Sequence, residues 1–149
     1  MTTAEASNLD VLYEQDETAW LEAMAALASE GRYGEMDFPN LSEYLTDMSK
    51  RDRREVFNRL IVLLVHLLKW EYQPDQRSGS WRATIREQRR ELRQLLESGT
   101  LRNHAAAVLM DAFAEARLQA ADESDMDVTV FPTANPWSLD EIMDQLDIS

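Results

Sequence analysis

The side chains best suited to chemistry form a row of arginines between residues 77 and 93. The row begins with Arg77-Ser78-Gly79-Ser80-Trp81-Arg82, which places guanidiniums and hydroxyls just before an expected helix start. Helix N-termini and arginines both bind phosphate and carboxylate groups. Arg77, Ser78, Ser80 and Arg82 are therefore a candidate site for phosphate or another small anion. The alternative is a helix cap whose arginines face solvent.

The helix expected after this corner carries an arginine stripe. At about 100° per residue, its arginines share a sector of roughly 100°. They are Arg82, Arg86, Arg89, Arg90 and Arg93. Guanidiniums on one stripe repel one another unless something anionic lies against them, so we expect carboxylates of the same chain or of a second copy there. Nucleic acid is a weaker alternative, since the acidic parts of the chain would compete for the stripe and repel phosphates.

The residue types present favour few other kinds of site. The chain has 2 histidines, 0 cysteines and 4 glycines. Neither His66 nor His104 has a carboxylate or histidine three or four residues away, the spacing of metal sites in helical bundles. Nothing matches a Gly-x-Ser-x-Gly turn or a glycine-rich phosphate loop. We therefore expect no metal, no cofactor and no identifiable catalytic residue, and a non-catalytic role is favoured over an enzyme.

The elements that must position these residues are helices. Between clusters of glycine and proline, apolar residues recur at intervals of three and four. This periodicity predicts helices over residues 16–29, 40–72, 81–97, 101–121 and 139–147. Ser49 begins a sequence like a helix cap, so we expect a break or kink there. No stretch has the alternation of a strand, and the predicted fold is all-α, a bundle of five to six helices.

A hydrophobic helix should lie at the centre of this bundle. It contains the run Leu60–Val65, in which Val62 and Val65 lie opposite the main apolar stripe. A helix that is apolar nearly all round is either central in a bundle or covered by another chain. Near the end of the chain, Ser138 and Glu141 fit a capping box, which predicts a short helix over residues 138–147. That helix can dock on its own chain or in the groove of a partner.

Charge divides the chain into three parts. The net charge of −13 over 149 residues is made up of −10 for residues 1–49, +6 for residues 50–93 and −9 for residues 94–149. Because opposite charges attract, we expect the acidic ends to fold over the basic middle in one domain, residues 1–149, with an acidic linker at residues 122–127. The apolar runs are far shorter than the ~20 residues of a membrane span, and no secretion signal is recognisable, so a cytoplasmic location is expected.

Several motifs resemble those of one protein family. The longest runs from His66 to Pro74 and resumes from Ser80 to Leu92. With Leu12–Asp16 and Trp20 before it, and Phe131-Pro132 and Pro136-Trp137 after it, the sequence resembles the bacterial "domain of unknown function 29" family. The resemblance implies an all-helical bacterial protein and no activity, substrate or catalytic residue. Its most recognisable stretch contains what we call the signature corner: His66, Lys69, Trp70 and Trp81.

The function that these observations favour is that of a non-catalytic interaction or adaptor protein that self-associates. Its partners would be a second copy or another protein, not a membrane. The first alternative is an enzyme or anion-binding protein whose site lies at the corner from Lys69 to Arg82. The second is a regulator associated with nucleic acid, suggested by the arginine stripe and the aromatic residues near it.

Overall fold

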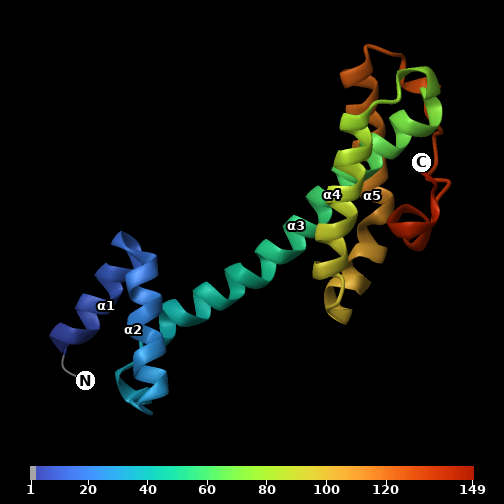
Figure 1. The fold of residues 1–149 in the computed structure, drawn as a ribbon. Helices are drawn as coiled ribbons and strands as arrows, with labels where there is room; N and C mark the ends of the chain where they lie inside the picture. Colours follow the sequence, from blue (N-terminus) through green and yellow to red (C-terminus); the bar gives the residue numbers. More distant parts are fainter. Residues whose placement is uncertain (1–2) are drawn as a thin grey trace. The chain divides into compact units, whose positions relative to one another are not determined.

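The computed structural model describes residues 3–149, which are all-α, with no strand among them (Figure 1). The α-helices are α1 (Thr3–Gln15), α2 (Glu17–Ser29), α3 (Phe38–Tyr72), α4 (Gly79–Leu95) and α5 (Gly99–Ser124). Short 3₁₀ turns lie at Tyr33–Glu35, Pro74–Gln76 and Val128–Val130, and one π-helical turn, η4, spans Glu141–Gln145. None of the helices in this part of the chain is long and apolar enough for a membrane span. The cytoplasmic location stays a prediction.

The chain divides into two compact units. The N-terminal unit ends at Lys50 and the C-terminal unit spans Arg51–Ser149, with α3 running through the boundary. The expectation of one domain over residues 1–149 stays a prediction.

The N-terminal unit is held together by few buried side chains. Between Asn8 and Lys50, the buried apolar residues are Trp20 and Met24. The Trp20 ring lies 4.7 Å from that of Tyr13 and 5.8 Å from that of Tyr44, and its Nε1 donates a hydrogen bond to Asp37 at 3.1 Å. These contacts join α1, α2 and the start of α3 around one indole ring.

The C-terminal unit has a larger core, built by the second half of α3, α4, α5 and the end of the chain. Both sides of α3 are buried there, since Leu60 and Leu67 of the main stripe and Val65 opposite them are all inaccessible to solvent. The buried alanines of α5 allow close packing of helices. They are Ala105, Ala112, Ala116 and Ala120. The burial of both sides of α3 confirms the prediction of a central hydrophobic helix.

Three boundaries differ from those that the sequence predicts. Helix α1 was not predicted, because its apolar stripe of Leu9, Leu12 and Tyr13 is short. The kink expected at Ser49 is wrong: α3 continues through it, because no glycine or proline interrupts the backbone hydrogen bonds between Asn40 and Tyr72. Helix α5 reaches Ser124, so half of the expected acidic linker is helical; Asp125, with φ of 51°, ends it.

The last expected helix is a single turn. Ser138 and Glu141 form the predicted capping box, with each side chain accepting from the other residue's backbone N–H at 3.1 and 3.2 Å. The helical turn ends with η4, because the next residue, Leu146, adopts an extended conformation. We call residues 131–149 the C-terminal segment. Phe131, Ile142, Met143 and Ile148 of this segment are buried in the core of the C-terminal unit, so it docks on its own chain.

Candidate functional site

The signature corner is centred on a buried lysine near the end of α3. Lys69 is only 8% exposed, because the helices on either side cover its aliphatic part. Its Nζ lies 2.9 Å from Glu123 Oε2 of α5 and 5.6 Å from the centre of the Trp81 ring of α4. One ammonium group therefore contacts a carboxylate and an aromatic face and links three helices. A buried charge needs such partners to offset its desolvation.

The carboxylate of this pair stays ionised to lower pH than an ordinary glutamate. Partial burial of Glu123 raises its pKa, but the hydrogen bond and the positive charge of Lys69 outweigh this, so the pKa lies below its usual 4.5. Gln119 and His66 act in the same direction. At neutral pH the corner therefore holds an ion pair rather than a free ammonium group.

A polar pocket of about 620 Å³ opens beside this ion pair. It is formed where α3, the 3₁₀ turn after it and the end of α5 meet, and Gln73 Nε2 donates to Ser124 Oγ at 2.8 Å across it. Its lining includes Lys69, Tyr72, Asp75, Trp81, Glu123 and Met126. The sequence suggested, as an alternative function, an enzyme or anion-binding protein with its site at this corner. A ligand of such a protein would lie in this pocket. That alternative stays a prediction.

The arginines of the corner bind Trp70 rather than line this pocket. The guanidinium carbons of Arg77 and Arg82 lie 4.8 and 5.4 Å from the centre of the Trp70 ring, which is buried. Arg77 Nε also donates to the Trp70 carbonyl at 2.8 Å, and Arg82 Nε donates to the Ile148 carbonyl at 3.0 Å. Both arginines therefore have cation–π and hydrogen-bond partners within the protein.

The two serines of the candidate anion site lie at the start of α4. Ser78 is the helix cap: its Oγ accepts from the Trp81 backbone N–H at 3.3 Å. Ser80 Oγ lies 3.3 Å from Ser78 Oγ. With Arg77 and Arg82 engaged by Trp70, these four side chains do not surround a common space. Anion binding at this corner stays a prediction.

The histidine of the signature corner forms a hydrogen bond within its own helix, α3. His66 is half-buried, and its Nδ1 donates to the Val62 carbonyl of α3 at 2.8 Å. Across the described residues 3–149, no group of three or more side chains is placed to hold a metal ion.

Three arginines of the stripe contact the C-terminal segment. Arg89 is 7% exposed, and it donates from Nε to the Ile142 carbonyl at 2.9 Å and from Nη2 to the Leu146 carbonyl at 3.0 Å. Arg93 donates to the Met143 carbonyl at 3.5 Å, and Arg82 reaches Ile148 as described. These carbonyls lie at or beyond η4, where a helical turn leaves acceptors unpaired and partly negative. Three of the five stripe arginines thus bind the acidic end of the same chain, through backbone oxygens rather than the carboxylates expected from the sequence.

Acidic side chains of the segment add to this contact. Burial lowers the pKa of Arg89, and the positive charge of Arg93 lowers it further. The negative charge of Asp144 raises this pKa and so partly offsets both effects. Arg102 of α5 lies 3.1 Å from Asp140. Charge therefore helps to place the segment, while the direct partners of the stripe are carbonyl groups.

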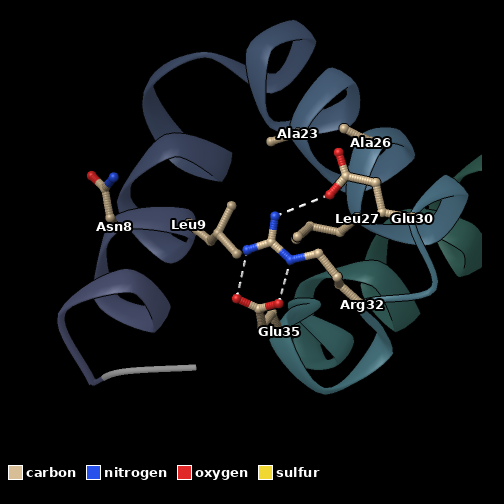
Figure 2. A pocket seen from close by; sticks show the side chains of 8 residues that line it. All are labelled: Asn8, Leu9, Ala23, Ala26, Leu27, Glu30, Arg32 and Glu35. Atoms are coloured by element: carbon tan, nitrogen blue, oxygen red, sulfur yellow. Dashed lines mark hydrogen bonds and ion pairs between the residues drawn. The ribbon is translucent and has the colours of Figure 1, made fainter.

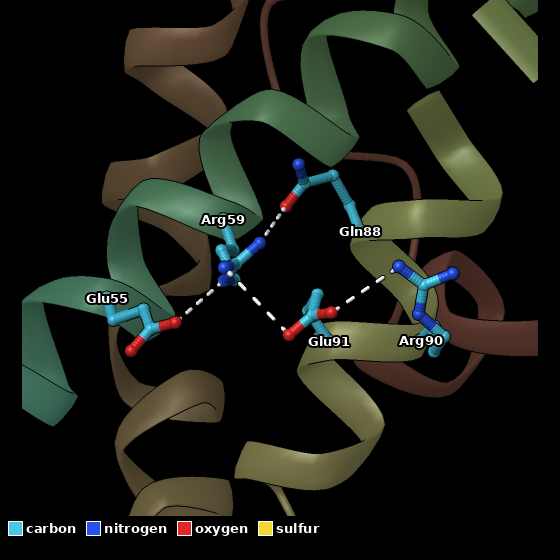
Figure 3. Close-up of polar contacts among 5 residues, drawn as sticks. All are labelled: Glu55, Arg59, Gln88, Arg90 and Glu91. Carbon is cyan, nitrogen blue, oxygen red and sulfur yellow. Dashed lines mark hydrogen bonds and ion pairs between the residues drawn. The ribbon is translucent and has the colours of Figure 1, made fainter. Parts of the chain in front are cut away.

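The remaining two arginines of the stripe are exposed. Arg90 is 3.4 Å from Glu91, whose other oxygen lies 4.0 Å from Arg59 of α3 (Figure 3). Arg59 is held more closely by Glu55 at 2.9 Å and by Gln88 at 3.2 Å. Among residues 3–149, Arg86 makes no hydrogen bond or ion pair.

The N-terminal unit has an apolar pocket of about 330 Å³ that the sequence did not indicate (Figure 2). Leu9 of α1 and Ala23, Ala26 and Leu27 of α2 line its apolar part. The guanidinium of Arg32 lies at its edge, paired with Glu30 at 3.0 Å and doubly with Glu35 at 2.5 and 2.7 Å. The single positive charge of Arg32 is therefore fully compensated, and the two carboxylates leave an excess of negative charge at the edge.

We expect Glu123→Gln to destabilise the C-terminal unit by about 1 kcal/mol at neutral pH, a modest effect because Glu123 is 42% exposed and solvent screens the pair. A carboxylate whose pKa is lowered on folding stabilises the protein above its unfolded pKa. That contribution disappears as the pH falls through the folded pKa. The difference between wild type and variant should therefore begin to shrink as the pH falls below 4.5, and vanish once the pH is below the lowered pKa of Glu123 in the folded protein. Urea unfolding over a pH series measures it, with exposed Glu115→Gln on the same helix as control. A difference that does not change with pH would contradict the role of the ion pair.

A family model described as "Domain of unknown function DUF29" matches residues 12–146. A comparison with curated proteins and one with solved structures each gave no match. The match includes both units, the signature corner and the arginine stripe. Its description names no reaction, ligand or partner.

Proposed function

This chain belongs to the DUF29 family, and we propose that it is a non-catalytic interaction protein that associates with a second copy of itself through its N-terminal unit. The observation that carries the proposal is the small core of that unit. Between Asn8 and Lys50 it buries the apolar side chains of Trp20 and Met24 and leaves many leucines partly exposed. Units of about this size have only marginal folding stability unless further apolar surface is buried, often by oligomerisation.

The surface available for association is the apolar pocket between α1 and α2. Leu9 and Leu27 are half-buried there, beside exposed Ala26. Uncovered apolar surface edged by polar groups is typical of protein interfaces.

A second copy is the occupant that this surface fits. It would bring an identical apolar patch, so that each copy covers the other in a two-fold arrangement. The charged group at the edge supports this, because Arg32 is already paired with Glu30 and Glu35 and needs no external anion. The net charge of −10 over residues 1–49 opposes the approach of two such units, and salt screens that repulsion. Self-association should therefore strengthen as salt is raised.

Ala26→Glu should weaken the dimer at least tenfold, because it places a carboxylate in the apolar pocket where the second copy would bury it. Sedimentation equilibrium over a concentration series at low and high salt measures this. Ala25→Glu is the matched control, since Ala25 is exposed on the same helix, does not line the pocket and receives the same substitution. Circular dichroism checks that both variants remain helical. A wild-type protein that is monomeric under both conditions, or equal effects of the two substitutions, would rule out the proposal.

A further inference from the structure

A second pocket of the C-terminal unit is lined almost wholly by arginines. Its volume is about 450 Å³, and its lining consists of Arg86, Arg89, Arg90, Arg93 and Ile148. All four arginines come from α4, where positions three, four and seven residues apart share one face. Ile148 of the docked C-terminal segment supplies the opposite wall. The volume is within the range of about 300–1,000 Å³ typical of small-molecule sites.

The positive charge of this pocket is only partly compensated within the chain. Arg89 and Arg93 donate to uncharged carbonyls, and Asp144 is the acidic group that acts on Arg89. Arg90 has a long contact with Glu91, which also faces Arg59 (Figure 3). Arg86 has no partner among residues 3–149. Four guanidinium groups thus line one pocket, and their positive charge exceeds the negative charge of the carboxylates near them.

We propose that this pocket binds the phosphate group of a small phosphorylated ligand. Guanidinium groups match phosphate oxygens in pairs of parallel hydrogen bonds. Arg86 and Arg90 have donors available, and Arg89 retains N–H groups beyond the two that bind carbonyls. A phosphate monoester carries about −1.5 to −2 charges at neutral pH, which suits several guanidiniums better than a single carboxylate does.

The site differs from the anion site suggested by the sequence. Arg77 and Arg82 are held by Trp70, whereas Arg86 and Arg90 lie one and two turns further along α4 and are exposed. The proposal does not rest on the proposed self-association, since the two sites lie in different units. The phosphate site can therefore be correct if the proposed self-association is wrong, and the reverse.

The experiment is calorimetric titration of the full chain with inorganic pyrophosphate at fixed ionic strength. We expect saturable binding at one site per chain. Arg86→Gln and Arg90→Gln should each weaken it roughly five- to tenfold, because each removes a charged donor without touching the carbonyl contacts of the C-terminal segment. Arg54→Gln is the matched control: Arg54 is an exposed arginine of the same unit that does not line the pocket. It should bind as wild type does.

A second titration with a single-stranded oligothymidylate distinguishes a small ligand from a nucleic acid. Pyrophosphate binding that depends on Arg86 and Arg90, with the oligonucleotide no tighter, supports the proposal. Oligonucleotide binding that depends on these arginines, without pyrophosphate binding, overturns it in favour of a nucleic-acid surface. No binding of pyrophosphate at millimolar concentration, or equal losses in Arg54→Gln, also overturns it.

Discussion

Trp20→Ala should unfold α1 and α2 while the C-terminal unit remains folded. Trp20 is the larger of the two buried apolar side chains between Asn8 and Lys50, and it packs against Tyr13 and Tyr44. Truncating a buried tryptophan costs about 3–5 kcal/mol. The substitution also removes the donor that binds Asp37. A unit with so small a core has little further burial to compensate, so the loss should exceed its stability.

Backbone NMR spectra and circular dichroism measure this result. The signals of residues in α1 and α2 should collapse to unfolded positions, and those of α4 and α5 should stay dispersed. Phe38→Ala is the control, because Phe38 is an aromatic residue of the same unit that is 53% exposed, and its truncation should leave the fold intact. Retention of native signals throughout Trp20→Ala would contradict the dependence of this unit on one indole ring.

The same variant connects stability with the proposed function. Ala23, Ala26 and Leu27 of α2 line the apolar pocket, so that unfolding α2 abolishes the surface on which a second copy would dock. Trp20→Ala should therefore be monomeric in sedimentation at high salt. Pyrophosphate binding by α4 should persist, because its arginines belong to the other unit. A single substitution thus separates the two proposals.

The helices were predictable where their apolar residues repeat along one face. The stripe of α5, from Ala105 through Ala112 to Ala120, is buried as the spacing predicts. Helix α1 has only the short stripe of Leu9, Leu12 and Tyr13, and it packs against α2, a contact that local sequence does not show. The cap-like sequence at Ser49 predicted a break for a related reason. A serine caps a helix only if the residues before it are not helical, and here the residues before Ser49 belong to the same helix.

The arginine stripe shows how far a sequence can describe a site. The spacing of Arg82, Arg89 and Arg93 predicts that these guanidiniums share one face of α4, and the structure places them so. Charge counting then suggested carboxylates as their partners. The structure gives backbone carbonyls of the C-terminal segment instead. Every residue has a carbonyl, so which of them remain unpaired depends on where a helical turn ends, and no residue type signals that in advance.

Arg89→Met should release the C-terminal segment from α4. It leaves the carbonyls of Ile142 and Leu146 without their donors in a region where Ile142 is fully buried. Losing two hydrogen bonds from a charged, buried donor should cost about 3 kcal/mol, part of which is the desolvation of the unpaired acceptors. For the C-terminal unit, of about 100 residues, that corresponds to a fall of roughly 12–24 °C in its melting temperature.

Thermal unfolding and hydrogen exchange of residues 131–149 measure this effect. Arg90→Met is the matched control, because Arg90 is the next residue of α4, has a side chain that is 63% exposed and donates its hydrogen bond to Glu91 rather than to the segment. Arg89→Lys should restore only part of the stability, since an ammonium group cannot reproduce two parallel bonds from a planar guanidinium. Equal melting temperatures and equal exchange for Arg89→Met and Arg90→Met would show that the segment is held by the burial of Phe131, Ile142 and Ile148 alone. The expected difference between them would instead show that the hydrogen bonds of Arg89 help to hold the acidic end of the chain on α4.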